Sequence, residues 1–167
     1  DAGSAPVAAF ASRGLAGLEW AAGIPGPIGG AAVGNAGAHG GDIAGALRLA
    51  TILDADLQTR DYTAAQLNYS YRSSCLKRAH HGPGDSDRVV LAAEFHLKPA
   101  PVADLEARVA EITERRKSTQ PPGASMGCMF KNPPGDHAGR LLDEAGLKGT
   151  RLGGAEISPV HANFFVS

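Results

Sequence analysis

The sequence is poor in cysteine, in aromatic side chains and in net charge. Its two cysteines, Cys75 and Cys128, are too few for a disulfide framework or for a cysteine-rich metal site. Aromatic residues make up 5% of the 167 residues, and the formal net charge is −1. Because no excess of positive charge is present, we expect neither a nucleic-acid partner nor an anionic membrane surface as a partner. We also expect no metal site.

The sequence also lacks a long apolar run and a signal peptide. No stretch approaches the length of a membrane-spanning helix, and the first residues do not have the signal-peptide pattern. A reducing cytoplasm is therefore the expected compartment. The chain begins at Asp1 and ends in an apolar run at Ser167, so we expect both ends to lie inside a longer protein. The alternative is a complete domain that was processed or cleaved from a tag.

Glycine, with 22 residues, is abundant in two segments, residues 17–30 and 34–43. Glycine allows positive φ angles and lets the backbone approach a flat or phosphorylated ligand closely. The alternative is a set of tight turns in an irregular loop. No G-x-G-x-x-G lies between a clear strand and a helix, so the pattern does not favour a Rossmann fold.

Hydrophobic periodicity predicts a mixture of helices and strands, which is typical of an α+β fold. Helices are expected over residues 6–17 and 101–117, and a last helix, capped by Asp136, over residues 136–146. Strands are expected over residues 44–53, 89–98, 153–158 and 163–166, and one helical turn over residues 62–67. Residues 78–88, with His80 and His81, are expected to form a polar loop.

Cys128 lies in a stretch, residues 125–135, that combines a reactive side chain with turn residues. Gly127 precedes the cysteine, Phe130 is suited to a core, and Asn132 stands beside a rigid Pro-Pro turn. A thiol in this setting can deliver a proton to a substrate. The alternative is a buried cysteine that acts as a small hydrophobic residue.

Several motifs occur in a fixed order along the chain. Ser-Met-Gly-Cys-Met-Phe-Lys-Asn-Pro at 125–133 is followed by Ala-Gly-Arg-Leu-Leu-Asp-Glu-Ala-Gly-Leu-Lys-Gly at 138–149 and by His-Ala-Asn-Phe at 161–164. This series resembles the substrate-binding domain of the MurB family, the UDP-N-acetylenolpyruvoylglucosamine reductases. Gly-Ile-Pro-Gly at 23–26 and Asn-Ala-Gly-Ala-His-Gly-Gly at 35–41 resemble that family's flavin-binding region, so the resemblance covers nearly the whole chain. The chain departs from the family pattern at Met126, where alanine is usual.

The resemblance implies a fold and a domain division. Residues 1–98 would form part of a vanillyl-alcohol-oxidase-type FAD-binding domain, and residues 99–167 a MurB-type substrate-binding α+β domain of the shorter subtype. The family's pyrophosphate-binding loop would precede residue 1, and its catalytic glutamate would follow residue 167. We therefore expect the 167-residue chain by itself to be inactive.

The resemblance also implies an activity. MurB proteins catalyse the NADPH-dependent, FAD-mediated reduction of UDP-N-acetylglucosamine enolpyruvate to UDP-N-acetylmuramate in bacterial peptidoglycan (cell wall) synthesis. A monomer in the bacterial cytoplasm is expected. An alternative function from another class is a non-catalytic module that binds a UDP-sugar or another nucleotide through its glycine-rich loops.

Site residues follow from the same resemblance. Arg72, in Tyr-Arg-Ser-Ser at 71–74, would stabilise charge on the substrate carboxylate, and Cys128 would donate the proton. Expected flavin contacts are Gly23, Ile24, Gly29, Gly30, Asn35, Ala36, Gly37 and Tyr71, and expected substrate contacts are Lys117, Asn132 and His161. For three of these positions, a purely structural role is the alternative. Arg72 would stack on Tyr71 at the surface, residues 115–117 would complement the helix dipole, and His161 would be a hydrogen-bonded loop histidine.

Overall fold

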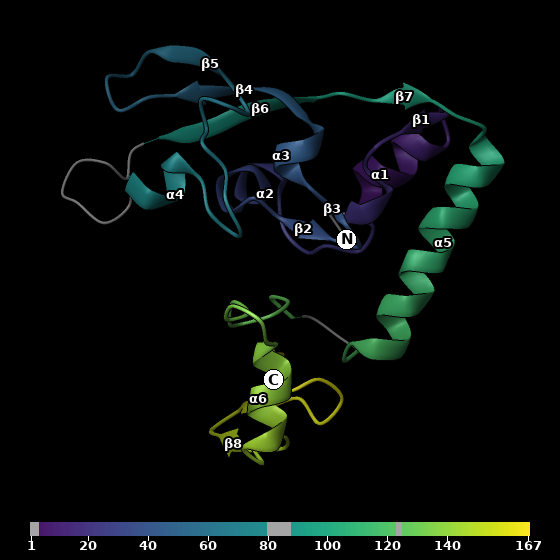
Figure 1. Cartoon of the computed structure of the whole chain (residues 1–167), viewed down its shortest axis with the longest axis vertical. Helices are drawn as coiled ribbons and strands as arrows, with labels where there is room; N and C mark the ends of the chain where they lie inside the picture. The colour runs from purple at the N-terminus through teal and green to yellow at the C-terminus, as the bar shows by residue number, and fades with distance from the viewer. Residues whose placement is uncertain (1–3, 80–87, 123–124) are drawn as a thin grey trace.

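The computed structural model describes residues 4–79, 88–122 and 125–167, and it has the α+β fold expected from the sequence. Figure 1 shows two lobes. The first lobe contains residues 4–122, and the second lobe contains residues 125–167. The lobes are joined at the C-terminal end of the long helix α5 (Val102–Thr119).

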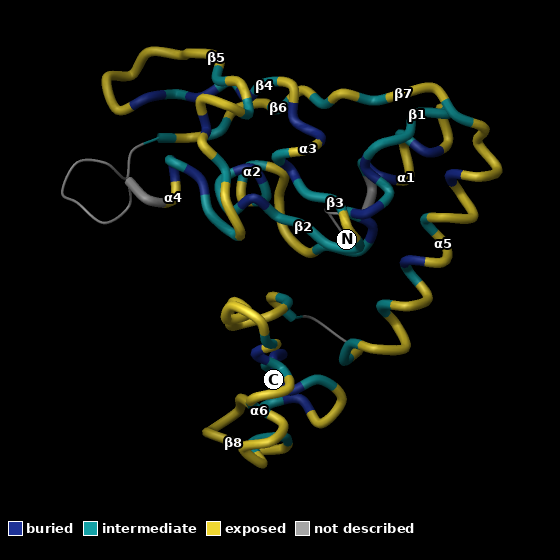
Figure 2. Tube along the Cα trace, viewed as in Figure 1, coloured by how far each residue is buried: buried dark blue, intermediate teal, exposed yellow. Residues whose placement is uncertain are grey.

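A three-stranded antiparallel sheet forms the centre of the first lobe. Its order is β5 (Thr59–Thr63), β4 (Leu47–Leu53) and β6 (Val89–Phe95). Side chains alternate along β4, and Ala50 and Ile52 on its inner face have no exposed surface. These two residues pack in a core cluster with Trp20 and residues from the helices beneath the sheet, whose buried positions are dark in Figure 2.

Residues Ile28–Gly34 of the glycine-rich region form the helix α2. The sequence had suggested either a ligand-binding loop or a set of tight turns here. The helix packs against β6, and a Cβ atom on Gly29 would lie 3.6 Å from the Val90 carbonyl oxygen. A Cβ atom at this position would therefore be in ordinary van der Waals contact with β6. The turn expectation is wrong for residues 28–34, because tertiary packing stabilises a helix whose intrinsic propensity is low.

The segment after α2 makes a small hairpin and a short helix. Strands β2 (Gly37–Ala38) and β3 (Gly41–Asp42) pair around His39 and Gly40, which both have positive φ angles. Helix α3 (Ile43–Ala46) follows, and the Asp42 side chain caps it by accepting a 2.9 Å hydrogen bond from the Gly45 N–H. The strand expected from residue 44 therefore begins three residues later, at Leu47.

Three helices close one side of the first lobe. Helix α1 (Ser4–Ala11) ends six residues before the predicted end at residue 17, in a turn with Gly14 at φ 69°. The 3₁₀ helix η1 (Glu19–Ala21) follows the strand β1 (Leu15–Ala16), which pairs with β7 (Lys98–Pro99). The predicted helix over 101–117 is confirmed as α5, and its buried Ile112 packs on Val7 of α1. Helix α5 therefore lies against the first lobe.

Residues 62–79 differ from the prediction. The helical turn expected over 62–67 is wrong, because β5 continues through Thr63 and residues 64–68 form turns. Helix α4 (Cys75–Ala79) was not expected. The polar loop predicted around His80 and His81 lies mostly outside the described residues.

The second lobe contains α6 (Ala138–Glu144) and an antiparallel sheet. The sheet has the order β10 (Phe165–Val166), β9 (Ala155–Ile157) and β8 (Arg151–Leu152). The predicted cap by Asp136 is wrong. His137 occupies the N-cap position, and the Ala138 N–H instead donates a 3.0 Å hydrogen bond to Asn132 Oδ1.

Phe130 is another correction in this lobe. Its side chain is 52% exposed and meets the Phe165 ring edge-on at 6.1 Å between centroids, so it is not the core anchor that the sequence predicted. Taking both lobes together, no helix within the described ranges has the length and apolar character needed to cross a membrane.

We predict that Gly41→Ala destabilises the first lobe by about 1–3 kcal/mol, because a Cβ atom there would overlap the indole ring of Trp20. Gly34→Ala is the matched control, since a Cβ atom at Gly34 meets no atom within 4 Å. Its free energy of unfolding should change by less than about 1 kcal/mol. Urea unfolding followed by circular dichroism measures both, and equal stability of the two variants would contradict the packing described for Trp20.

Candidate functional site

A cavity of about 350 Å³ brings Arg72 and Cys128 together from different lobes. Arg72 comes from the first lobe, and Cys128 comes from the second. Eleven residues line the cavity: Ile24, Pro25, Gly37, Ala38, Arg72, Arg116, Gln120, Met126, Gly127, Cys128 and Phe164. The two predicted catalytic residues, 56 positions apart in sequence, therefore share one site.

Arg72 is held by a tight turn and by the glycine-rich segment. Ser70 and Ser73 exchange two backbone hydrogen bonds of 3.0 and 3.1 Å, and Arg72 lies between them with φ 53°. Its guanidinium donates to the carbonyl oxygen of Asn35 at 3.4 Å and to that of Gly37. The stacking alternative is also present, because Arg72 Cζ lies 5.7 Å from the centre of the Tyr71 ring. A guanidinium has five N–H donors, so donor capacity is left for an anion.

Cys128 is held from the C-terminal segment by Asn163, which is 2% exposed. The Asn163 side chain accepts a hydrogen bond from the Phe130 N–H and donates one to the Phe130 carbonyl oxygen, each at 2.9 Å. The Asn163 carbonyl oxygen accepts a third, from the Met129 N–H at 2.9 Å. Asn163 was not predicted as a site residue. Its signal in the sequence is an amide within the otherwise apolar run of residues 162–166.

The surroundings of Cys128 keep its thiol protonated at neutral pH. Although the residue is exposed to the cavity, the surrounding protein desolvates the charged form and raises the pKa of the thiol. The positive charges of Arg72 and Arg116 act in the opposite direction and favour the thiolate. The site therefore contains a thiol that holds a proton and two cations that stabilise the charge left when the proton departs.

Arg116 is the cation of α5 that lines the cavity, whereas the family resemblance indicated Lys117. Arg116 lies against Gly23, where an added Cβ atom would be 2.9 Å from its Nε atom. Burial is the main cause that lowers the pKa of Arg116. The helical spacing contains the signal for this residue, because Arg116 lies four positions after the buried Ile112 and continues the inward face of α5.

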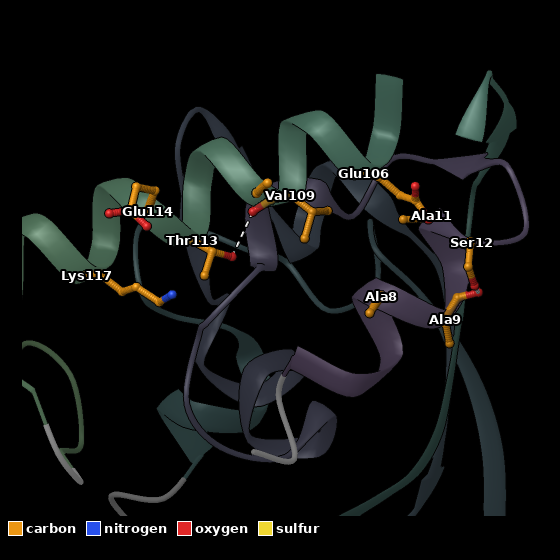
Figure 3. Close-up of a pocket in the computed structure, with 10 residues that line it drawn as sticks. Ala8, Ala9, Ala11, Ser12, Glu106, Val109, Thr113, Glu114 and Lys117 are labelled. Atoms are coloured by element: carbon orange, nitrogen blue, oxygen red, sulfur yellow. Dashed lines mark hydrogen bonds between the residues drawn. The ribbon is translucent and has the colours of Figure 1, made fainter. Parts of the chain in front are cut away.

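Lys117 lies on another face of α5. It lines an open groove of about 650 Å³ between α1 and α5, shown in Figure 3 beside Thr113 and Glu114. It also borders a hollow that includes Gly23 and Arg116. Lys117 lines neither cavity that contains Cys128. Its role as a substrate contact stays a prediction.

A second cavity, of about 430 Å³, brings the predicted substrate residues Asn132 and His161 together beside Cys128. Asn132 caps α6 with its side chain, and its N–H donates to Tyr71 Oη at 3.4 Å, which links the two lobes. Cys128 therefore lines both cavities.

His161 is a neutral imidazole in this arrangement. Its Nδ1 accepts a 3.2 Å hydrogen bond from the Asn163 N–H, which assigns the ring proton to Nε2. Burial is the main cause that lowers its pKa. Gly139 leaves room for the ring, since a Cβ atom there would lie 2.9 Å from His161 Cε1. His161 is therefore a hydrogen-bonded loop histidine, as the alternative interpretation proposed, and it also lines the cavity.

The predicted flavin contacts separate into three groups. Ile24 and Gly37 line the first cavity. Gly29 and Gly30 lie in α2 and line neither cavity. The other four residues contact other parts of the protein. Gly23 packs against Arg116, and Asn35 makes side-chain hydrogen bonds. Ala36 makes backbone hydrogen bonds to residues 31 and 43, and Tyr71 contacts Arg72 and Asn132.

Ile24, Pro25, Gly37 and Ala38 line part of the first cavity. These side chains are small or apolar, so a planar ligand can approach the backbone, and Arg72 and Arg116 can bind its anionic groups. No group of three metal-ligating side chains occurs among the described residues. The two guanidinium groups favour a ligand with anionic groups.

Comparisons with known proteins point in one direction. Residues 118–167 match the family model of the C-terminal domain of UDP-N-acetylenolpyruvoylglucosamine reductase. The reductase of that name from Chloroflexus aggregans is 51% identical over 158 residues, which are 95% of this chain and 52% of that protein. The one from Chloroflexus aurantiacus is 46% identical over 167 residues, covering 98% of this chain and 56% of that protein.

A solved structure is also similar. The crystal structure of UDP-N-acetylenolpyruvylglucosamine reductase (MurB) from Thermus caldophilus aligns with a TM-score of 0.85 and 42% sequence identity. The alignment covers 98% of this chain and 57% of that one. The chain spans about half the length of the relatives it matches.

We predict that Cys128 is alkylated by iodoacetamide with a pH midpoint above that of a free thiol, because desolvation raises its pKa. Arg116→Gln should raise the midpoint further, since it removes a charge that stabilises the thiolate. The measurement uses a Cys75→Ala background and rates between pH 7 and 11. An unchanged or lower midpoint in Arg116→Gln would contradict the stabilisation of the thiolate by Arg116.

Proposed function

Because the chain belongs to the UDP-N-acetylenolpyruvoylglucosamine reductase family, we propose that it forms the part of such a reductase that contains Arg72 and Cys128. The reaction is the reduction of UDP-N-acetylglucosamine enolpyruvate to UDP-N-acetylmuramate, in peptidoglycan synthesis in the bacterial cytoplasm. The observation that carries the proposal is the single cavity that contains a guanidinium and a protonated thiol from separate lobes. A binding module has no need for this pair.

We further propose that residues 1–98 belong to the FAD-binding domain and residues 99–167 to the substrate-binding domain. The packing of α5 on α1 would put this helix of the second domain beside the first domain. When bound, FAD and NADPH would supply the reducing equivalents. Ile24 and Gly37, on one wall of the first cavity, are the residues best placed to hold the flavin ring.

Arg72 has the task of stabilising negative charge. Hydride addition to the enolpyruvyl double bond drives electron density toward the adjacent carboxylate, and a fixed cation in a poorly solvated site stabilises that charge more than water does. The carbonyl oxygens of Asn35 and Gly37 hold the guanidinium before substrate binds, so little reorganisation is needed. Arg116 supplies a second positive charge to the same cavity.

Cys128 has the task of donating the proton that completes the reduction at C2 of the enolpyruvyl group. Its raised pKa keeps the donor loaded at neutral pH. After transfer, the thiolate would remain between Arg72 and Arg116, whose charges lower the free energy of that anion until a proton from solvent restores the thiol. Desolvation thus favours the protonated thiol before proton transfer, and the two cations favour the thiolate after it.

The rest of the substrate would extend into the second cavity, past Asn132 and His161. His161 presents an Nε2–H donor to a ligand, because its Nδ1 is occupied by the Asn163 N–H. Lys117 stays a predicted contact for this part of the substrate, although it lines the groove between α1 and α5.

The test of Cys128 uses a chimera in which this chain replaces the matching part of the Chloroflexus aggregans reductase. Cys128→Ala should slow the oxidation of reduced flavin by the enolpyruvyl substrate by about 10²–10⁴-fold, because alanine cannot donate a proton. Cys128→Ser should retain much more activity, since a hydroxyl can donate. Flavin reduction by NADPH, which does not use this proton, serves as the internal control in stopped-flow traces.

Two outcomes would contradict the proposal. Equal reoxidation rates in Cys128→Ala and Cys128→Ser would remove Cys128 from the role of acid. A chimera that binds a UDP-sugar but never oxidises NADPH would favour the non-catalytic binding module.

Arg72→Lys in the same chimera should reduce kcat by an amount equivalent to about 2–4 kcal/mol, the usual effect of removing one donor that stabilises a developing anion. Lysine keeps the charge but lacks the planar pair of donors that a guanidinium offers a carboxylate. Steady-state kinetics measure the loss, and Arg48→Lys, on the exposed face of the sheet, is the control. Similar kcat values for the Arg72 and Arg48 variants would place Arg72 outside the reaction.

A further inference from the structure

Asn35 is a buried polar residue that connects the glycine-rich segment to the turn that carries Arg72. It is 5% exposed and lies at the C-terminal end of α2 with φ 45° and ψ 60°, a left-handed conformation that asparagine tolerates better than most residues. This conformation ends the helix and directs the chain into β2. The side chain is then enclosed by the hairpin and by residues 69–74.

The side-chain amide of Asn35 has its hydrogen-bonding groups occupied inside the protein. Its Oδ1 accepts a 2.9 Å hydrogen bond from the Ala44 N–H, and its Nδ2 donates to the Ser70 carbonyl oxygen at 3.1 Å and to Asp42 Oδ2 at 3.3 Å. Both N–H groups and the oxygen therefore have partners. The side chain is committed to the protein rather than to a cofactor.

The Ser70 carbonyl group that Asn35 holds belongs to the turn around Arg72. Arg72 occupies a left-handed conformation, φ 53°, that costs a non-glycine residue about 1–3 kcal/mol and persists only where the surroundings support it. Asn35 supports it twice, through Ser70 and through its own carbonyl oxygen, which accepts from the Arg72 guanidinium at 3.4 Å. Asn35 thus contacts both the turn that carries Arg72, at Ser70, and the Arg72 guanidinium.

We propose that Asn35 is the positioning residue that holds the Arg72 guanidinium in the cavity with Cys128. The importance of this role rests on the proposed function, since it matters for catalysis only if Arg72 acts in the reaction. The positioning itself is independent of any substrate. It assigns to Asn35 a role other than the flavin contact that the family resemblance implied.

The thiol of Cys128 reports where the guanidinium lies. Arg72 and Arg116 are the cations that favour its thiolate, and the other charged or titratable groups lining its cavities are His137, Arg140, Asp143, Lys148 and His161. All of these except Arg72 are the same in every variant compared. A displaced guanidinium therefore appears as a higher pH midpoint of Cys128 alkylation, measured on the whole 167-residue chain without substrate.

The experiment is a double-mutant cycle in a Cys75→Ala background. Asn35→Gly removes the side chain, adds no charge and keeps the positive φ accessible. We expect Asn35→Gly and Arg72→Gln each to raise the midpoint, and the double variant to match Arg72→Gln alone, because no guanidinium is left to displace. Tyr62→Phe is the control, since it removes a hydrogen bond to the buried Asp54, which follows β4, and should leave the midpoint unchanged.

A folded Asn35→Gly variant with the parental midpoint would overturn the proposal, and so would full additivity with Arg72→Gln. If Asn35→Gly does not fold, Asn35→Asp keeps the acceptor for the Ala44 N–H but repels the Ser70 carbonyl group. The added negative charge shifts the pH midpoint of Cys128 alkylation by itself. This direct shift cancels when the effect of Asn35→Asp on the midpoint is compared between the parental and Arg72→Gln backgrounds. A larger effect with Arg72 present supports the proposal, and equal effects refute it. No outcome depends on reductase activity, so failure of the proposed function is seen separately.

Discussion

The candidate site depends on a backbone turn that is unfavourable for its own sequence. Arg72 takes a left-handed conformation between Ser70 and Ser73, and an isolated peptide would rarely adopt it. The turn forms here because buried polar groups of a distant segment, the Asn35 amide and the Asn35 and Gly37 carbonyl oxygens, are satisfied by it. If that turn relaxed, the cavity would lose one of the two positive charges that act on Cys128.

In the second lobe, another buried asparagine, Asn163, holds the backbone that carries the reactive side chain. Asn163 pairs with both backbone groups of Phe130, as a strand would, and thereby fixes the segment that carries Cys128. Each lobe thus uses one buried amide to hold one reactive side chain. Since an unpaired amide in a buried position costs about 1–3 kcal/mol, each contact is strongly favoured once the lobe has folded.

Electrostatics then give the cavity its chemical character. Desolvation favours the neutral thiol of Cys128, and the charges of Arg72 and Arg116 favour the thiolate. Neither effect alone suits an acid that must hold a proton and then release it. Because the raised pKa is the net result, the protonated form is the resting form, which agrees with the direction of proton transfer in the proposed reaction.

The sequence by itself determined the α+β class, the helix over residues 101–117 and the family, because these depend on periodicity and on motifs that can be read locally. Arg72 and Cys128 were also chosen from motifs. Only the tertiary structure decided that they share one cavity, that Arg116 and not Lys117 enters it, and that residues 28–34 form a helix. The physical reason is that burial and hydrogen bonding between distant segments outweigh local preference. Helix α2 packs on β6, the Asn35 side chain reaches the Ser70 carbonyl group 35 residues away, and Asn163 reaches Phe130 33 residues away.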